Sequence, residues 1–558
     1  MGDNTGDRAK GLIEYHNRTK HHPRRYAASP GGLDWSNQPD PFRRYSGTDV
    51  LQLPLLASDP ALPYGRLFDR AGIEPAPFTV ERIAALLELS LGLSAWKSYG
   101  GSSWALRMNP SSGNLHPTEG YVVLPPSAAG GVFHYNPYLH ALEARASFGE
   151  PFWSAVRARL GTDGFLAGLS SIYWRESWKY GERAFRYCNL DLGHAIAALS
   201  LSAALLGWRV TCLESLASGD VSTVLGFDRT RWRELEAEDP ECLLLVHRAD
   251  EDPVAGFDPE DVVKPFAALA FSGVPEPLSP GHVDWEVIYR AAELSEKPRT
   301  PAPPPGPPAS APPLYAPGPP EAASAAAVIR KRRSGQAYDG AAHMAMVDFL
   351  AMLARTSPVA GRAPFDAGFH RSNIHLLVFV HRVTGLAPGL YIFLRGDDRE
   401  RERALERLKR DLHPGFSWAP AAPERPEVPL HLLEEGDVTG LARSLSCNQE
   451  IAGDGAFSMG MLAAFRENIE KAPYMYRRLH WEAGMIGQVL YLESEARGFG
   501  GTGIGCFFDD MVHEGLGLAD DSFQTIYHFT VGAPLIDGRI TTLPPYHHLG
   551  RGSPGAGR

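Results

Sequence analysis

Two segments of this chain repeat one pattern and decide how it folds. Residues 186–207 have the sequence RYCNLDLGHAIAALSLSAALLG, and residues 477–498 have the sequence RRLHWEAGMIGQVLYLESEARG. Each begins with arginine, has glycine at its eighth position, continues as a largely apolar stretch and ends in glycine, at one offset of 291 residues. The same offset separates Gly226 from Gly517. Constant spacing within a matching hydrophobic pattern predicts an internal duplication.

The periodicity of apolar residues predicts a mixture of helices and strands in each half. Apolar residues recur at intervals of three and four, which favours helices, over residues 80–93, 191–206, 344–355 and 481–496. Strand-like runs, bounded by turn residues, cover residues 121–124, 242–246, 374–380 and 525–531. Helices packed on a small mixed sheet, twice over, place the chain in the α+β class.

A proline-rich stretch separates the two halves. Between Pro298 and Pro320, twelve of twenty-three residues are proline, interleaved with alanine, glycine and serine. Because proline donates no backbone hydrogen bond, we predict an extended, polyproline-like spacer, with a docking site for another protein as the alternative. The predicted domains are an N-terminal repeat at 1–296, a linker at 297–322 and a C-terminal repeat at 323–550.

The composition excludes several classes of protein. The chain has 558 residues, of which 44% are hydrophobic, enough for two or more buried cores. Its net charge of −11 argues against a nucleic-acid partner, which would favour a basic surface. The polar start and the lack of a long apolar segment predict a cytoplasmic protein without a membrane anchor. The five scattered cysteines and the twenty histidines show neither a disulfide framework nor the spacing of a metal site.

Three short segments carry residue types that suit a cofactor with a ring and a phosphate. Residues 107–121 (RMNPSSGNLHPTEGY) offer hydroxyl and amide side chains on a turn shaped by proline and glycine. Residues 330–335 (RKRRSG) place four cations and a hydroxyl at a helix-to-loop junction, which suits a phosphate. Residues 498–506 (GFGGTGIGC) form a glycine-dense loop whose N–H groups can face an anion. Taken singly, the first segment is most often an ordinary turn and the second is usually a solvated surface. The third is a glycine-rich loop without a nucleotide-binding motif.

Together, these segments on a duplicated scaffold resemble the nitroreductase superfamily, and within it the SagB/ThcOx-type dehydrogenases that oxidise azoline rings to azoles in peptide natural products. Residues 15–21 (YHNRTKH) resemble the leader pattern of that subfamily, and residues 179–194 (KYGERAFRYCNLDLGH) resemble its Lys-Tyr segment. Residues 110–114 are similar to the Pro-Ser turn that contacts the flavin. Residues 332–334 are similar to the Arg-Arg-Ser phosphate-binding motif, and residues 482–488 (EAGMIGQ) to the same helix in its usual form.

The resemblance implies that the two repeats share the duties of two subunits. In the superfamily each FMN lies at a dimer interface, where one subunit supplies the Arg-Arg-Ser motif and glycine loop and the other supplies the Pro-Ser turn. The first repeat here keeps the Pro-Ser turn but has GWRVTCLE at 207–214 in place of the glycine loop. The second keeps Arg-Arg-Ser and the glycine loop but has FHRS at 369–372 in place of the turn. These complementary losses predict an intramolecular pseudo-dimer with one FMN site per chain and one degenerate site.

The resemblance also assigns roles to individual residues. The FMN-binding residues that it implies are Arg107, Pro110, Ser111, Ser112, Asn114, Arg330, Arg332, Arg333, Ser334, Gln488, Gly501, Gly503 and Gly505. Gln336 stands where the superfamily usually has arginine, so one phosphate or ribityl contact is weaker or passes to Lys331 or Arg330. Lys179 and Tyr180 are the implied catalytic residues, with a base function beside the flavin; otherwise Lys179 is a surface residue and Tyr180 a packing residue.

Three functions are compatible with this sequence. The first is an FMN-dependent oxidoreductase that acts on a small or peptidic substrate, by azoline oxidation or a related reaction. The second is an NAD(P)H-dependent nitro- or quinone reductase, which needs an open flavin face for the nicotinamide. The third is a redox-silent assembly subunit that works with other biosynthetic enzymes. The retained Lys179, Tyr180 and FMN-binding set favour the first, and the internal pair of repeats predicts a monomer.

Overall fold

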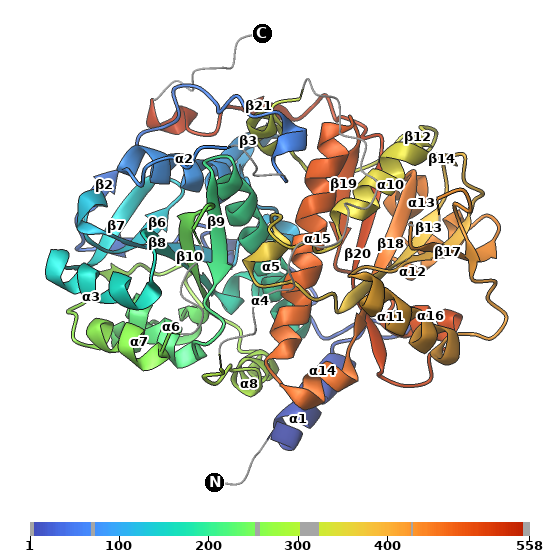
Figure 1. Ribbon diagram of the computed structural model, residues 1–558, viewed down its shortest axis with the longest axis horizontal. Helices are drawn as coiled ribbons and strands as arrows, with labels where there is room; N and C mark the ends of the chain where they lie inside the picture. Colours follow the sequence, from blue (N-terminus) through green and yellow to red (C-terminus); the bar gives the residue numbers. More distant parts are fainter. Residues whose placement is uncertain (1–4, 69–72, 252–256, 302–322, 426–427, 551–558) are drawn as a thin grey trace.

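The computed structural model describes residues 5–68, 73–251, 257–301, 323–425 and 428–550. Two seven-stranded sheets dominate it, one in each half of the chain (Figure 1). The first has the order β2-β7-β6-β5-β8-β10-β9 and the second the order β16-β17-β15-β13-β18-β20-β19. The shared order, with six strands in matching places, confirms that the chain contains two α+β repeats.

The strands of the first sheet are β2 (Val50–Gln52), β5 (Thr118–Leu124), β6 (Gly131–Asn136), β7 (Ala141–Ser147), β8 (Gly164–Ser171), β9 (Trp208–Cys212) and β10 (Asp239–Arg248). The strands of the second sheet are β13 (Ile374–Val380), β15 (Gly389–Phe393), β16 (Ala419–Pro420), β17 (Leu430–Glu435), β18 (Phe457–Ala464), β19 (Gly500–Ile504) and β20 (Phe523–Gly532). Every described pair within these two sheets is antiparallel. The prediction of mixed sheets was therefore wrong, because strand-like runs do not reveal the direction of their partners.

Smaller pairings complete the β-structure. They are β1 (Tyr45–Ser46) with β11 (Val274–Pro275), β12 (Met344–Ala345) with β14 (Val383–Thr384), and the three-stranded sheet β21-β3-β4 formed by β21 (Thr541–Leu543), β3 (Leu93–Tyr99) and β4 (Ser102–Arg107). The parallel β12–β14 pair corrects one predicted helix, which begins at Met346 because the two residues before it join a strand. The predicted helix 80–93 ends at Ser90, because the chain enters β3 at Leu93.

Helices cover the sheets. Those of the first half are α1 (Thr5–Arg18), α2 (Val80–Ser90), α3 (Glu150–Leu160), α4 (Tyr173–Tyr180), α5 (Ala184–Ala204), α6 (Ser218–Leu225), α7 (Pro259–Ala267) and α8 (Glu286–Leu294). Those of the second half are α9 (Ala325–Lys331), α10 (Met346–Arg355), α11 (Asp398–Asp411), α12 (Thr439–Leu445), α13 (Ile451–Asp454), α14 (Arg466–Lys471), α15 (Met475–Ala496) and α16 (Asp509–Leu516). The two repeated segments of the sequence are α5 and α15, which both begin before the predicted residues.

The two repeats meet where α5 packs against α15 at the centre of the molecule (Figure 1). All residues of α5 are buried, and its polar residues, such as Arg186 and Asp191, have partners in neighbouring segments. The matched glycines Gly193 and Gly484 lie at the crossing. A Cβ added to Gly193 would lie 2.1 Å from the carbonyl oxygen of Trp481, and one added to Gly484 would lie 2.1 Å from that of Leu190. Glycine therefore allows the two backbones to touch.

The other matched glycines also have a structural reason. Gly207 and Gly498 follow the ends of α5 and α15 with φ of +68° and +75°, and each precedes the edge strand of its sheet. Gly226 and Gly517 cap α6 and α16, both with φ of +75°. Residues other than glycine are strained in this left-handed region, so the same backbone turn requires glycine in both copies. The constant spacing in the sequence thus reflects the geometry of a repeated unit.

Both described ends of the chain pack on the opposite repeat. The N-terminal helix α1 lies against α14, and the buried His16 contacts the side chain of Gln524 at 3.2 Å (Figure 1). Near the C-terminus, β21 pairs with β3 of the first half. The predicted domain boundaries stay a prediction, and most of the predicted spacer, residues 302–322, lies outside the described residues. Because each end packs on the other repeat, both halves contribute residues to the surfaces between the repeats.

Candidate active site

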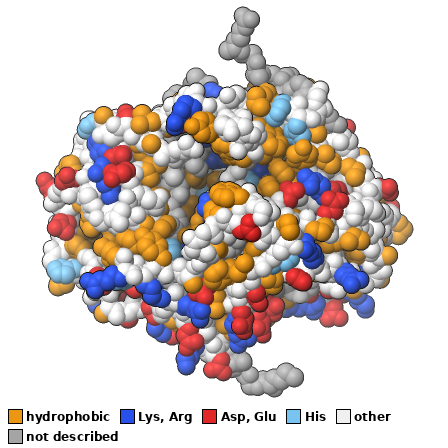
Figure 2. Space-filling model, turned by 180° about the vertical axis from the view of Figure 1, so that it is seen from behind, with side chains coloured by type: hydrophobic (Ala, Val, Ile, Leu, Met, Phe, Trp, Pro, Cys, Tyr) orange, Lys and Arg blue, Asp and Glu red, His pale blue; other side chains and the backbone are white. Residues whose placement is uncertain are grey.

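A cavity of about 810 Å³ lies between the repeats and is lined by segments of both halves. This volume is within the range of small-molecule and cofactor pockets. The first half contributes β4, the turn at residues 109–116, and the ends of α4 and α5; the second contributes residues 331–336, the β19 strand and residues 534–542. The face shown in Figure 2 is hollowed near its centre, and acidic and basic side chains are interspersed around it. The cavity thus combines the three segments that stand out in the sequence.

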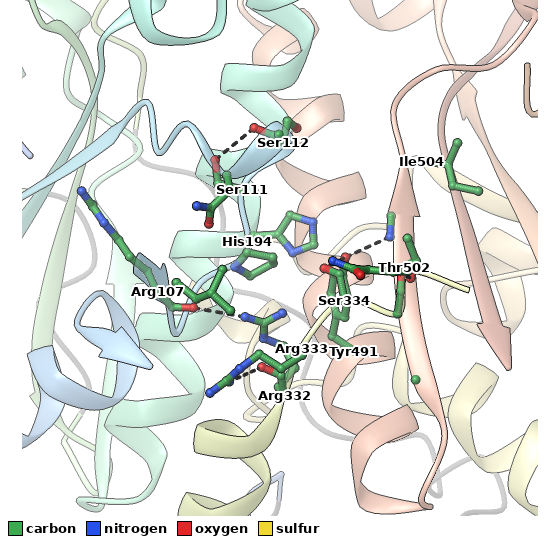
Figure 3. A pocket seen from close by; sticks show the side chains of 18 of the residues that line it. Arg107, Ser111, Ser112, His194, Arg332, Arg333, Ser334, Tyr491, Thr502 and Ile504 are labelled. Atoms are coloured by element: carbon green, nitrogen blue, oxygen red, sulfur yellow. Dashed lines mark hydrogen bonds between the residues drawn. The ribbon is translucent and has the colours of Figure 1, made fainter. Parts of the chain in front are cut away.

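Two arginines, the buried Arg332 and the half-buried Arg333, form a positively charged end of the cavity (Figure 3). Arg332 caps α9 and donates to the backbone oxygen of Arg107 at 3.1 Å, while its buried Nε has no hydrogen-bond partner among the described residues. Arg333 donates to the backbone oxygen of Ser94 at 2.9 Å. Within the described part of the chain, neither guanidinium forms an ion pair with a carboxylate.

The unpaired charges indicate an anion site. Burial, followed by the charge of Arg332, lowers the pKa of Arg333 to about 10, and burial also lowers the pKa of Arg332. Buried charge is costly unless a partner of opposite sign is present. Guanidinium groups hold phosphate through paired, charge-assisted hydrogen bonds. Lys331 and Lys97 also line the cavity and add positive charge there.

Arg330 does not reach this cavity. Its guanidinium forms ion pairs with Asp59 at 2.8 Å and Glu88 at 2.6 Å, both in the first half. Arg330 lies in the last turn of α9, and the helix directs it away from the residues that follow the helix end. Its predicted role at the phosphate therefore has no geometric support, and its contacts instead join the two halves.

The predicted Arg-Arg-Ser and glycine segments lie side by side. The Ser334 hydroxyl is 2.9 Å from the Tyr491 hydroxyl, which also accepts from the backbone N–H of Gly503 at 3.0 Å (Figure 3). The backbone N–H of Gly335 donates to the carbonyl of Gly501 at 3.1 Å. Tyr491 on α15 was not predicted from the sequence, yet it joins both segments. Its position inside an apolar helix gave no local signal of this role.

Glycines in β19 and directly after it make room for aromatic rings that line the cavity. A Cβ on Gly503 would lie 1.8 Å from the Tyr527 hydroxyl oxygen, and one on Gly505 would lie 2.2 Å from the ring of Tyr187. Both tyrosines line the cavity. Gly501 packs against Phe529 instead, and it does not line the cavity. Glycine at 503 and 505 is thus required by the close approach of two rings.

The Pro-Ser turn is held from behind by an acidic residue of α5. Asp191 accepts from the backbone N–H and the hydroxyl of Ser112, both at 3.0 Å. The Ser111 hydroxyl accepts from the backbone N–H of His116 at 2.8 Å. The side chain of Asn114 donates to the carbonyl of Ala105 at 2.9 Å, and its amide oxygen is 2.9 Å from His116 Nε2. These contacts fix the shape of the turn and leave Pro110, Ser111, Ser112 and Asn114 on the cavity wall.

Arg107 lies in the wall with its side chain directed away from the cavity. Its guanidinium donates to the backbone oxygens of Thr118, at 3.3 Å, and of Pro41. Its own carbonyl oxygen accepts from Arg332, which links the phosphate end to the first half (Figure 3). Burial lowers the pKa of Arg107 to about 10. Arg107 therefore contributes to the site through its backbone carbonyl group, which accepts a hydrogen bond from Arg332.

The implied catalytic pair lies at the end of α4, against the Pro-Ser turn. A Cβ added to Gly113 would lie 2.6 Å from the Tyr180 hydroxyl oxygen and 3.2 Å from Lys179 Nζ. Tyr180 lines the cavity, and Lys179 lies beside it with Nζ 5.2 Å from the centre of the Tyr180 ring. Burial, followed by the nearby Glu176, raises the pKa of Tyr180 well above its usual value, so its phenol stays protonated at neutral pH.

Two buried acids lie behind this pair. Burial raises the pKa of Asp191 to about 7, although hydrogen bonds from Ser111 and Ser112 lower it. Glu176, one helical turn before Tyr180, is fully buried, and neither carboxyl oxygen has a partner among the described residues. Burial and the charge of Asp191 raise the pKa of Glu176 well above its usual value. A pair of protonatable groups therefore adjoins the catalytic candidates.

Replacing Asp191 by asparagine is expected to change how stability depends on pH. The pKa is about 7 when folded and roughly 3.9 when unfolded, so the folded state binds this proton more tightly. Its stabilising contribution is complete below about pH 4 and is lost as pH rises through 7. Relative to wild type, Asp191→Asn should therefore gain stability between these values, of the order of 2–4 kcal/mol. Urea unfolding midpoints measured from pH 4 to 8 check this result.

Asp509 provides a control of opposite sign for that experiment. It is also buried, but the Arg183 and Arg186 guanidinium groups hold its pKa well below the usual range. Its contribution is present above the unfolded pKa, so Asp509→Asn should be destabilised by a constant amount from pH 5 to 8. A constant difference for Asp191→Asn as well would contradict the raised pKa of Asp191.

A histidine that the sequence did not single out occupies the middle of the cavity (Figure 3). His194 Nε2 is 3.1 Å from the Tyr527 hydroxyl, while the buried Nδ1 has no partner among the described residues. Burial, then the charge of Arg332, lowers the pKa of His194 to about 3, so the ring is neutral. Gln488 is buried beside it on α15 and does not line the cavity, so its predicted contact with a cofactor has no direct support.

The corresponding place on the other side of the α5–α15 pair is filled by side chains. Glu214, at the sequence offset that matches Gly505, forms an ion pair with Arg478 at 3.0 Å. Arg478, which matches Tyr187, also donates to the carbonyl of Gly368 at 2.9 Å. The space beside this pair measures about 30 Å³, which is room for a single water molecule. Of the two equivalent positions on either side of the α5–α15 pair, one is therefore an open cavity and the other is filled by Glu214 and Arg478.

Neither a metal centre nor a membrane span is evident in the described part of the chain. No group of three or more His, Cys, Asp or Glu side chains there could hold a metal ion. No described helix is both long and apolar enough to cross a lipid bilayer.

The fold and cavity define a tandem α+β protein with a cofactor-sized site between its repeats. The nitroreductase family model matches residues 74–244 and 329–533, more than half of the chain, and the chain belongs to this family. A solved structure from Anabaena variabilis, described as a nitroreductase, is 22% identical with a TM-score of 0.67, over 94% of this chain and 99% of that one. At this identity the similarity shows the shared fold.

A curated relative has a more specific name. The trifolitoxin-processing protein TfxB of Rhizobium leguminosarum bv. trifolii is 31% identical over 173 residues. The match covers 28% of this chain and 46% of TfxB, so it spans about half the length of that relative.

Proposed function

We propose that this protein is an FMN-dependent oxidoreductase with one FMN site per chain, and that its reaction is the SagB/ThcOx-type oxidation of azoline rings in a peptide. One observation carries the proposal: Arg332 and Arg333, which form no ion pair with a described carboxylate, and the Pro-Ser turn come from different repeats and line the same cavity. Membership of the nitroreductase family supports an oxidoreductase, because its members generally bind flavin.

The residues present suit FMN. Arg332, Arg333 and Ser334 would hold the phosphate, because they combine two guanidinium groups that form no ion pair with a hydroxyl at one end of the cavity. The Ser111–Ser112 turn and the backbone of Gly503 and Gly505 would border the ring system, because these residues line the cavity. When bound, FMN supplies two-electron hydride chemistry.

The chain's own residues would manage the proton. Oxidation of an azoline to an azole removes a hydride from one ring carbon and a proton from its neighbour. Tyr180 lines the cavity, and Lys179 lies beside it without lining the cavity itself; Lys179 would accept this proton and the protonated Tyr180 would orient the ring by hydrogen bonding. Asp191 lies behind them and can receive the proton, because its pKa of about 7 leaves it partly ionised at neutral pH.

The proposed substrate is peptidic. Supporting this, TfxB is a trifolitoxin-processing protein, and it shares 31% identity with this chain over the matched region. We further propose that the protein acts in the cytoplasm as a single chain, beside other enzymes of peptide modification. The internal packing of α5 on α15 supports a single chain, because it occupies the surface through which two subunits would otherwise pair.

Flavin content tests the proposal. The purified protein, saturated with FMN and freed of excess, should show a flavin spectrum and release one FMN per chain. Two FMN per chain would contradict the closed second site, and none after saturation would overturn the oxidoreductase. A peptide with a synthetic azoline should then lose two hydrogen atoms on incubation, detected by mass spectrometry. If that peptide stays unchanged while NAD(P)H is oxidised in the presence of a quinone or nitroarene, the reductase function replaces azoline oxidation.

A further inference from the structure

Two of the cysteines that are scattered in the sequence meet at the wall of the cavity. Cys506 follows the glycine strand β19 and lines the cavity. Cys447 lies in the turn between α12 and α13. Two hydrogen bonds fasten this turn to the Cys506 segment: Phe508 N–H donates to the carbonyl of Leu445 at 2.8 Å, and the Gln449 side chain donates to the carbonyl of Cys506 at 3.1 Å. These bonds flank Cys447 on both sides and hold it against Cys506.

The turn that carries Cys447 has an unusual backbone. Cys447 and the following Asn448 have φ of +54° and +59°, which are left-handed values at two consecutive residues other than glycine. Such conformations are costly and persist where the surrounding structure determines them. Here the flanking hydrogen bonds do so, and Gln449, which lines the cavity, depends on the same turn. The placement of Cys447 is therefore enforced by its surroundings.

A histidine from the start of the chain completes the cluster. His21 forms a β-bridge with Phe508, and its backbone N–H donates to the Asp509 carboxylate at 2.9 Å. Its Nδ1 accepts from the backbone N–H of Ala27 at 3.0 Å, which leaves Nε2 to interact with Cys506. The Arg183 guanidinium donates to the carbonyl of Gly505 at 3.1 Å and adds positive charge beside the thiol.

These neighbours give the two thiols different pKa values. The Cys447 thiol, and then His21 and Arg183, lower the pKa of Cys506 to about 5, against the effect of burial. The Cys506 group raises the pKa of Cys447 well above its usual value. A thiolate is the reactive form of cysteine, and a low pKa next to a second thiol is typical of thiol–disulfide exchange sites.

We propose that Cys506 and Cys447 are a redox-active pair that forms a reversible disulfide in the cavity wall. The Cys506 thiolate attacks one sulfur of a low-molecular-weight disulfide such as oxidised glutathione and releases one thiolate. Cys447 then attacks Cys506 Sγ and releases the second thiolate, which takes the proton that Cys447 loses. Two protein thiols are oxidised, and one small disulfide is reduced to two thiols. The disulfide removes a negative charge beside Tyr187 and fixes the Gln449 turn.

The full chain, equilibrated in glutathione buffers from reducing to oxidising and then quenched with acid, tests this pair. Alkylation in denaturant and peptide mapping should show one disulfide, between Cys447 and Cys506, while Cys188, Cys212 and Cys242 remain alkylatable. In Cys447→Ser, glutathione should accumulate on Cys506; in Cys506→Ser, at least about tenfold less should attach to Cys447. The matched control Cys242→Ser should keep the disulfide.

The outcome does not depend on the proposed function, because the exchange requires no flavin and is measured in flavin-free protein. Circular dichroism spectra of each variant show whether it is folded, and Cys447→Ala serves as the second variant at that position. Thiols that stay reduced at 447 and 506 across the whole range, in folded wild-type protein, would overturn the proposal. Equal glutathione attachment in the two single variants would overturn the assignment of Cys506 as the attacking group.

Discussion

Replacing Arg332 by methionine is expected to weaken FMN binding by a factor between about one hundred and ten thousand. The Arg332 side chain is buried, its Nε has no partner among the described residues, and Glu495 offsets its charge without forming an ion pair. Each hydrogen bond between charged groups contributes about 1.5–3 kcal/mol, and a bidentate contact with phosphate loses two of them. Titration of flavin-free protein with FMN, followed by the quenching of flavin fluorescence, measures the change in Kd.

Arg330→Met is the matched control, since it removes the same group two residues away. Arg330 pairs with Asp59 and Glu88, so its loss should lower the free energy of unfolding and leave the Kd for FMN within about threefold of wild type. Arg332→Lys keeps the charge but not the paired donors, and it should restore only part of the affinity. Equal losses of affinity in Arg330→Met and Arg332→Met would contradict the assignment of the phosphate to the buried end.

Replacing Tyr180 by phenylalanine is expected to lower kcat by roughly 10²–10⁴-fold while FMN stays bound. The substitution keeps the ring that packs beside Lys179 and removes the hydroxyl that reaches the Pro-Ser turn. Loss of one positioned hydrogen-bond donor at the reacting group typically lowers kcat by about 10²–10³-fold, which lies within this range. Turnover of an azoline-containing peptide, measured with the flavin content of each preparation, gives kcat and KM separately.

Tyr173, at the other end of α4, supplies the control. Its hydroxyl donates to Asp239 at 2.7 Å and it does not line the cavity. Tyr173→Phe should therefore change stability by about 1 kcal/mol and leave kcat unchanged. If Tyr180→Phe retained full turnover with FMN bound, Tyr180 would be a wall residue and Lys179→Met would become the decisive variant.

The repeat could be predicted from the sequence because matched glycines define it, and each of these glycines is required by the backbone geometry at its own position. Gly207 and Gly498 are needed for a left-handed turn, and Gly193 and Gly484 for helix contact, so their spacing survives in the sequence. The beginnings of α5 and α15 were missed for the opposite reason. Polar residues there, such as Arg186, are buried by partners from the other half, which no local pattern reveals.

The candidate site was predictable only where a motif is continuous in the sequence. The Pro-Ser turn, Arg332 to Ser334, Gly503 and Gly505 line one cavity, whereas Gly501 does not. His194, Tyr491 and Tyr527 were missed, since each belongs to a buried element and reaches the cavity only through packing between repeats. Arg330 and Gln488 were implied by the resemblance, but Arg330 pairs with Glu88, and Gln488 contacts His194 without lining the cavity.

The ion pair between Glu214 and Arg478 has a consequence for how such a protein can change. In a symmetric homodimer both interface sites are encoded by one stretch of DNA, so a carboxylate in place of the glycine would close both sites at once. Here the two copies are encoded separately within one chain. Glu214 could arise without altering Gly505, and each side of the molecule is now free to diverge under its own selection.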